Sequence, residues 1–358
     1  MNDTSTSDIS YPIAQFITVL YYSNIYKIIG TINLMVILSL GIIGNFLVVI
    51  VVYFSRGMHT PTNCFLVSLS IADMITLLSS ILPVISEYHS KMNYWRFAPE
   101  LCPITVFLQF CSANASAMSI TCFSFERWMA ICKPLTAQVM CTLTRAVKII
   151  FGIWVFNLLY NSSWLYLTTL KYRESYINSS ILNPVCTYRL NPEYLRIVYL
   201  CDLIIFYITP LIVTSVLYID IVLTLLNKKD SKLRIVGKKF VKESKIVKSK
   251  LKVIKMLITV VVLFAVLWLP YRSWIVYNSF AEKKYLDLWF VLFARSMVYV
   301  NSAINPILYN AMSAKFRKAF KSSLTCRQIF SSKAQEYLDC SEMKDPPGNP
   351  YLAVCHGK

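Results

Sequence analysis

The sequence is short of charge, of histidine and of any internal repeat. Only 15% of its 358 residues are charged, against about 25% in soluble domains, and 56% are hydrophobic. Its mean hydropathy is +0.53. This composition excludes an ordinary soluble globular protein and favours a membrane protein. The first residues also lack the basic start of a signal peptide, so we expect the first apolar span to act as its own insertion signal.

These absences also weigh against two other classes of membrane protein. An intramembrane enzyme needs a paired set such as His-Glu-x-x-His or two aspartates, but His59, His89 and His356 fall in loops or in the tail. A transporter or channel, which is the rival class, favours repeats or several intramembrane charges. No repeat is evident, and Asp73 is the single central membrane charge.

Seven apolar stretches have the length of a membrane span. They lie at about 28–54, 64–87, 102–134, 146–167, 195–226, 252–279 and 286–312. The third has small and amide residues in its middle, and polar groups at membrane depth should face a protein interior. We therefore predict an all-α membrane protein, a seven-transmembrane helix bundle with the third span as its axis. A short amphipathic helix at 313–324 would lie on the membrane surface, between the 28–312 bundle and a disordered tail at 325–358.

The distribution of basic residues predicts how the bundle is oriented. Of 36 Lys and Arg, 25 fall on the side of the 228–255 linker and the C-terminal tail, and 11 on the other side. By the positive-inside rule the tail is cytoplasmic and residues 1–27 form an extracellular tail. The net charge of +18 is thus assigned to inner loops, not to nucleic acid. Two glycosylation sequons, at Asn2 and Asn178, then face outside, whereas those at Asn114 and Asn161 fall within spans and are false matches.

Several short motifs occur in a fixed order along these spans. They are Asn45, the run SLSIAD ending at Asp73, Cys102, Glu126-Arg127-Trp128, Trp154, Cys186, Pro210, Phe264 with Trp268 and Pro270, and Asn305-Pro306 with Tyr309. Together they resemble the rhodopsin-like (class A) family of G-protein-coupled receptors, from Gly44 to Phe320. The resemblance implies a plasma-membrane receptor that is not an enzyme and that couples to a heterotrimeric G protein, with arrestin and a receptor kinase as further partners.

The resemblance also implies roles for the motif residues. Cys102 and Cys186 would form a disulfide that ties the outer loop across the cavity; two free thiols are the alternative. Asp73 would hold an allosteric sodium ion with Ser116, Asn301 and Asn305, since oxygen donors suit a hard cation. The alternative is a hydrogen bond between Asp73 and Asn45. No other cofactor is expected.

The inner halves of the spans carry the residues of an activation switch in that family. Arg127 would pair with Glu126 at rest and reach toward Tyr218 and Tyr309 when active; a structural salt bridge is the alternative. Trp268, beside the kink expected at Pro270, would convert ligand pressure into a helix movement, or simply pack. The remaining residues of the switch are Phe264, Asn305 and Pro306. Trp128 departs from the tyrosine usual there.

The outer halves of the spans suggest the ligand. Gln109 stands where aminergic receptors carry Asp, and Tyr299 where opsins carry the retinal lysine. The cavity is predicted to offer hydrogen-bonding groups together with the apolar ring of Phe110, namely Gln109, Phe110, Asn114, Asp202, Tyr271, Arg272 and Arg295. Arg295 could hold a carbonyl or carboxylate with two hydrogen bonds, or could instead form an internal salt bridge with Asp202. These groups suit a short peptide with blocked ends.

Within the family, longer runs such as FLQFCSANASAMSITCFSFERW and NSAINPILYNAMSAKFR resemble thyrotropin-releasing-hormone receptors. That resemblance implies ligand contacts from Asn114, Tyr271 and Arg295 and signalling through the Gq class, with phospholipase C and calcium. Phe110 replaces a tyrosine of that group, which leaves a related amidated peptide equally open. A neuromedin- or neurotensin-like receptor is the runner-up. Cys326 is a candidate for palmitoylation or a free thiol.

Overall fold

The computed structural model describes residues 21–174, 182–189, 191–233, 240–312 and 316–317 of the chain. The predicted sites at Asn2, Asn178 and Cys326, and most of the predicted surface helix at 313–324, lie outside these residues. Phe316 and Arg317 are helical, and the Phe316 ring packs against Tyr309 with ring centroids 6.3 Å apart.

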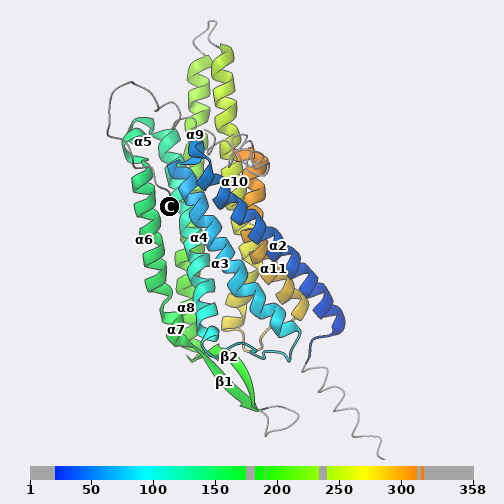
Figure 1. Ribbon diagram of the computed structural model, residues 1–358. Coiled ribbons are helices and arrows are strands. Elements are labelled where there is room, and N and C mark those ends of the chain that lie inside the picture. The colour runs from blue at the N-terminus through cyan, green and yellow to red at the C-terminus, as the bar shows by residue number, and fades with distance from the viewer. Residues whose placement is uncertain (1–20, 175–181, 190, 234–239, 313–315, 318–358) are drawn as a thin grey trace, which may run out of the picture.

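The described chain is a bundle of long helices with one β-hairpin at one end (Figure 1). The helices in chain order are α2 (Asn24–Phe54), α3 (Pro61–Tyr88), α4 (Leu101–Cys132), α5 (Pro134–Met140), α6 (Leu143–Asn161), α7 (Ser163–Leu167), α8 (Pro192–Leu203), α9 (Thr209–Leu233), α10 (Phe240–Phe280) and α11 (Leu288–Met312). Short 3-10 and π segments, η1 (Arg56–Met58) and η2 (Ile204–Ile208), complete the helical chain. Strands β1 (Thr168–Glu174) and β2 (Leu182–Tyr188) pair antiparallel, with Leu170 opposite Cys186.

Local sequence signals set several helix boundaries. Ser23 caps α2 by accepting the Tyr26 N–H, and Thr60 caps α3 by accepting the Asn63 N–H. Pro61 occupies the first turn of α3, where its missing N–H costs nothing. Thr142 caps α6 in the same way as Thr60 caps α3. The predicted spans therefore appear as helices that begin or end a few residues from the expected bounds.

Two spans differ from the prediction in length or regularity. Helix α10 begins at Phe240 instead of about 252, and its 41 residues exceed what a bilayer requires. The fifth span is divided into α8, the π-helical turn η2 and α9. Pro210 lies two residues after the end of η2 and has no N–H to donate to the preceding turn, which explains the irregularity at this point.

Six helical spans of the described chain meet the length and composition of a membrane crossing. Helix α11 is the seventh; Arg295 and several asparagines lower its hydropathy. Helix α4 lies at the centre, in contact with α3, α6, α9 and β1. Its predicted polar face is buried, including Ser112, Ser116 and Ser119. The third span is therefore the axis of the bundle, as its composition predicted.

Candidate functional site

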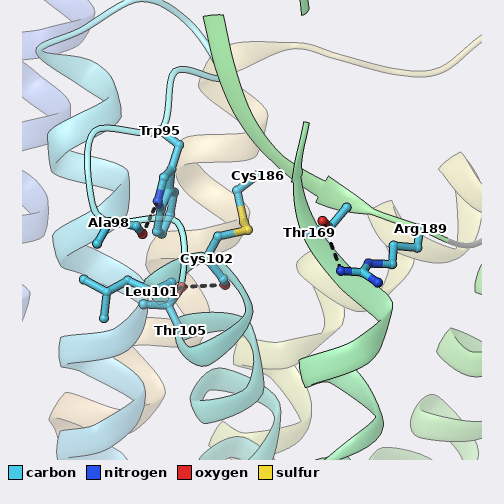
Figure 2. The surroundings of a disulfide bond; sticks show 8 residues. All are labelled: Trp95, Ala98, Leu101, Cys102, Thr105, Thr169, Cys186 and Arg189. Carbon is cyan, nitrogen blue, oxygen red and sulfur yellow. Dashed lines mark hydrogen bonds between the residues drawn. A yellow bond between two sulfur atoms is a disulfide. The ribbon is translucent and has the colours of Figure 1, made fainter. Parts of the chain in front are cut away.

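The β-hairpin is fastened to the N-terminal end of α4. Cys186 of β2 and Cys102 of α4 form a disulfide, with 2.07 Å between the sulfur atoms and 5.7 Å between the Cα atoms (Figure 2). The Trp95 N–H donates to the Pro184 carbonyl, and the Lys91 ammonium donates to the Asn183 side chain. The alternative of two free thiols is wrong, and the hairpin covers one end of the bundle in a fixed position.

Beneath the hairpin lies a cavity of about 100 Å³. Its walls come from α3, α4, α8, α10, α11 and β2. Five of the seven predicted spans therefore line it, and the first and fourth do not. The lining residues are Thr76, Ser80, Gln109, Phe110, Ala113, Asn114, Tyr188, Tyr199, Trp268, Tyr271, Arg272, Ile275, Arg295, Val298 and Tyr299. Six of the seven predicted ligand-contacting residues are among them. Asp202 is the exception.

Two arginines line this cavity, and they differ in whether they form an ion pair. Arg272 Nη1 lies 2.6 Å from Asp202 Oδ2 in a buried ion pair, and its guanidinium sits 5.0 Å from the centre of the Trp268 ring. Arg295, from α11, has no hydrogen bond or ion pair with any residue that the structure describes. The alternative of an Arg295–Asp202 salt bridge is therefore wrong, because Asp202 pairs with Arg272.

Asp202 also explains the orientation of Asn114. The Asn114 Nδ2 donates to Asp202 Oδ1 at 2.8 Å and to Asn161 Oδ1 at 3.1 Å. Its Oδ1 has no partner within the described chain, although the residue is only 1% exposed. Asn114 thus uses its donors inside the protein and leaves an acceptor at the cavity. Asp202 does not line the cavity, but its carboxylate binds both Arg272 and Asn114 and so positions these two lining side chains.

The aromatic part of the cavity is continuous. Phe110 stacks on Trp164, with ring centroids 4.2 Å apart and an angle of 9° between the rings. Tyr199 packs beside both rings. Gln109 donates to the Ser79 carbonyl at 2.9 Å, which holds its amide against α3. The floor is closed by Trp268, whose Nε1 has no partner among the described residues.

Below the cavity, Asp73 lies in a polar pocket between α3, α4 and α11. It is 1% exposed and accepts hydrogen bonds from Ser116 Oγ at 3.2 Å and from Asn305 Nδ2 at 2.8 Å. Asn301 is buried on α11, one turn before Asn305. The predicted alternative partner, Asn45, instead donates to the carbonyls of Gly41 and Ser302. A carboxylate, a hydroxyl and amide groups are donors that fit a hard monovalent cation.

Comparisons with known proteins decide the family. The model of the 7 transmembrane receptor (rhodopsin family) matches residues 44–309. The chain belongs to the rhodopsin family of seven-transmembrane receptors. The thyrotropin-releasing hormone receptor of Mus musculus is 39% identical over 87% of this chain and 83% of that receptor, and the human one is 38% identical over 87% and 82%. The human neuromedin-U receptor 2 is 31% identical over 89% of this chain and 76% of that receptor.

Membership of the rhodopsin family makes the chain a multi-pass membrane receptor and not an enzyme. The predicted switch residues Glu126 and Arg127 lie near the C-terminal end of α4. Glu126 Oε1 lies 3.9 Å from Arg127 Nη2, and the same guanidinium group donates to Thr62 Oγ1. Tyr218 is hydrogen-bonded to Ser124 at 2.8 Å. In this rhodopsin-family chain Arg127 is therefore held by α3 and α4, with Tyr218 occupied elsewhere.

The other predicted switch residues form a column along α10 and α11. The ring centroids of Phe264 and Trp268 are 6.1 Å apart. Trp268 lies two residues before Pro270, which is inside α10. On α11, Pro306 lies inside the helix, and the buried Tyr309 hydroxyl has no partner within the described residues. Phe264 and Trp268 thus lie together on α10, and Asn305, Pro306 and Tyr309 lie on α11.

Sequence reasoning missed three features of the site. Asn161 was taken only as a false sequon, although it completes the network through Asn114 to Asp202. An asparagine deep in an apolar span is itself a sign of an internal partner. Tyr188 and Tyr199 line the cavity but lacked a motif. At the outer rim, Tyr22 donates to Glu87 at 2.6 Å, and burial together with that carboxylate raises the pKa of the Tyr22 hydroxyl.

Proposed function

We propose that this chain is a plasma-membrane receptor for a short, end-blocked neuropeptide of the thyrotropin-releasing-hormone type. The observation that carries the proposal is the charge of the outer cavity. Its lining contains two arginines and, among the described residues, no carboxylate. A cationic amine would meet Arg295 without a counter-ion, whereas a ligand rich in carbonyl groups would satisfy its donors.

The unpartnered atoms of the cavity support the same ligand class. Asn114 Oδ1 lacks a donor and Trp268 Nε1 lacks an acceptor among the described residues, and the Arg295 guanidinium lines the same cavity. An amide group supplies a donor and an acceptor side by side. A peptide whose amino end is blocked brings such groups without an ammonium, which Arg272 and Arg295 would repel. The amidated carboxyl end rests on the resemblance to thyrotropin-releasing-hormone receptors.

The relatives support a peptide ligand, but they include receptors for two different kinds of peptide. Thyrotropin-releasing hormone receptors and a neuromedin-U receptor are both similar to this chain. A different short neuropeptide is therefore the second candidate. The aromatic wall of Phe110 and Trp164 favours a ligand with a ring that can stack or insert there.

We propose that the opposite end of the bundle faces the cytoplasm and binds a heterotrimeric G protein of the Gq class. Support comes from the family, from the basic residues of the linker between α9 and α10, and from Arg127 at this end of α4. The hairpin and its disulfide would then face the outside, where disulfides persist. Arrestin and a receptor kinase would share the cytoplasmic surface.

We propose further that a sodium ion at Asp73 regulates the receptor. Asp73, Ser116, Asn301 and Asn305 would hold it, and the ion would neutralise a carboxylate that is otherwise buried among neutral groups. When bound, the ion supplies charge compensation. The protein groups hold the carboxylate in place and connect α3, α4 and α11.

The direct test is a screen of amidated short peptides on cells that express the full chain, with intracellular calcium as the readout. We expect one peptide with blocked ends to raise calcium, and a phospholipase C inhibitor to abolish the response. A version of the active peptide with a free amino end should be weaker, since its ammonium would face the two arginines of the cavity. A response to a small amine with none to any peptide would contradict the proposed ligand class.

A further inference from the structure

A second cavity, of about 230 Å³, lies near α5 and the beginning of α6, at the end of the bundle opposite the hairpin (Figure 1). Residues of α3, α4, α5, α6 and α9 line it. It shares no lining residue with the outer cavity. Nothing in the proposed peptide recognition uses this site.

One polar atom in this cavity lacks a partner. The Glu126 side chain is only 8% exposed, and its Oε1 lies 3.9 Å from Arg127 Nη2, a long separation for an ion pair. Thr62 also interacts with the Glu126 carboxyl group through a side-chain hydrogen bond, whereas Oε2 has no hydrogen-bond partner in the described part of the chain. A carboxylate oxygen buried in this way carries a large desolvation cost unless something donates to it.

The remaining lining is mostly apolar, and part of it lies at the surface of the bundle. Ile149, Phe125 and Val213 are respectively 37%, 45% and 38% exposed. The second charged lining residue is Arg145. Its Nη1 contacts the Met140 sulfur, which is a weak acceptor, and no described oxygen accepts from its side chain.

We propose that this cavity binds the headgroup of a phosphatidylethanolamine molecule from the surrounding bilayer. The primary ammonium would donate to Glu126 Oε2, and the phosphate would accept from Arg145. The acyl chains would lie along the apolar residues of α6 and α9. The headgroup thus matches both charged residues of the cavity, one with each of its own charges.

Related lipids lack part of this match. Phosphatidylcholine carries a quaternary ammonium, which has no N–H to donate to Glu126. Phosphatidylserine adds a carboxylate that would approach the carboxylate of Glu126. A sterol offers one hydroxyl and leaves Arg145 without an anion. The requirement for N–H donors is therefore the property that distinguishes the proposed ligand.

The test is native mass spectrometry of the purified full-length receptor, incubated with equal amounts of phosphatidylethanolamine and phosphatidylcholine of identical acyl chains. We expect phosphatidylethanolamine to be retained at least about fivefold more often, as a charge-assisted hydrogen bond predicts. Glu126→Gln should bring the ratio to about one, because a neutral amide has lost the charge that attracts the ammonium. The control is Asp220→Asn, which removes an exposed carboxylate at the same end of the bundle, bonded to Trp128 and outside the cavity.

A second variant protects the test against misfolding of Glu126→Gln. Val213→Trp fills the cavity from its lipid side without changing a charge, and it should lower the ratio in the same way. Equal retention of the two lipids by the unmodified receptor overturns the proposal. So does a preference for phosphatidylserine, or a preference for phosphatidylethanolamine that persists in either folded variant. The readout needs no peptide, so its failure would leave the proposed ligand class untouched.

Discussion

The α10 wall and the α11 wall of the outer cavity each contribute one arginine, and the two arginines differ in what surrounds them. Arg272 on α10 is paired with the buried Asp202, which also orients Asn114. Arg295 on α11 lies beside Tyr271 and Tyr299, which line the same cavity, and the carboxylate that acts on it is Glu87, which accepts a hydrogen bond from Tyr22. The first arginine forms a direct ion pair inside the protein, and the second forms no ion pair with a described residue.

This difference separates structure from recognition. A buried ion pair does little for a ligand, because its donors and acceptors are already used, and breaking it leaves a buried charge. A guanidinium that faces a cavity without a partner gains most when a ligand supplies acceptors. We therefore assign ligand recognition mainly to the α11 wall and the positioning of the cavity mainly to the α10 wall.

The largest expected effect is that of Arg295→Ala on peptide potency. Loss of two charge-assisted hydrogen bonds should raise the concentration for half-maximal calcium response by about 100-fold or more. Arg295→Lys should recover only part of this loss, since an ammonium cannot make the two-pronged contact. Surface expression, measured by antibody to an N-terminal tag, should be unchanged.

The matched control for Arg295 is Arg196→Ala. Arg196 lies on α8 outside the cavity lining, with its guanidinium 4.7 Å from the centre of the Phe280 ring. It should alter potency little. If Arg295→Ala abolished expression while potency in the surviving receptor stayed normal, the arginine would be structural and the comparison between the two walls would fail.

The second prediction concerns the ion pair of the α10 wall. Arg272→Ala should destabilise the ligand-free receptor by about 3–5 kcal/mol, because Asp202 would be left buried without its cation. Asp202→Ala should be destabilising as well, and the double variant should be more stable than the sum of the two single losses implies. Thermal denaturation of the detergent-solubilised receptor measures this. Strictly additive losses would show that the two residues do not act as a pair.

The third prediction concerns Asp73, a buried carboxylate that, unlike Asp202, has no cationic side chain bonded to it among the described residues. Asp73 is satisfied in part by Ser116 and Asn305, so Asp73→Asn should preserve the fold. Sodium should lower peptide affinity of the unmodified receptor by about tenfold, a coupling within the usual range for two linked sites, and this effect should disappear in Asp73→Asn. Radioligand binding in sodium and in N-methylglucamine buffers gives both values. An identical sodium effect in the variant would remove the ion from this pocket.

Much of the fold and of the cavity followed from the sequence, because membrane burial leaves clear signals. Apolar length predicted the spans, and the rarity of polar residues at depth marked Asp73, Asn114 and Arg295. The pairing between polar residues did not follow. Whether Asp202 meets Arg272 or Arg295 depends on the relative rotation of α8, α10 and α11, about which hydropathy carries no information.

The irregular backbone of the fifth span could not be predicted from the sequence either. The division of the fifth span by the π-helical turn η2 changes which side chains of α8 face inward, and Pro210 alone could not predict its length. Asn161 was visible as a polar residue in an apolar span but was interpreted by a surface motif. Both errors come from interpreting a residue by its local sequence when its partner lies on another helix.

The smallest effect expected is that of Phe110→Tyr, which tests the aromatic side of the cavity that α4 contributes. The Phe110 ring is fixed by stacking on Trp164, so the new hydroxyl would project from a ring whose position is already set. If the ligand presents an acceptor there, one added hydrogen bond of about 1 kcal/mol should improve potency about fivefold. Phe107→Tyr, one turn away on α4 and outside the cavity lining, is the matched control and should change nothing. A loss of potency in Phe110→Tyr alone would mean that the ligand packs an apolar group against this ring, which would favour a different short peptide over one of the thyrotropin-releasing-hormone type.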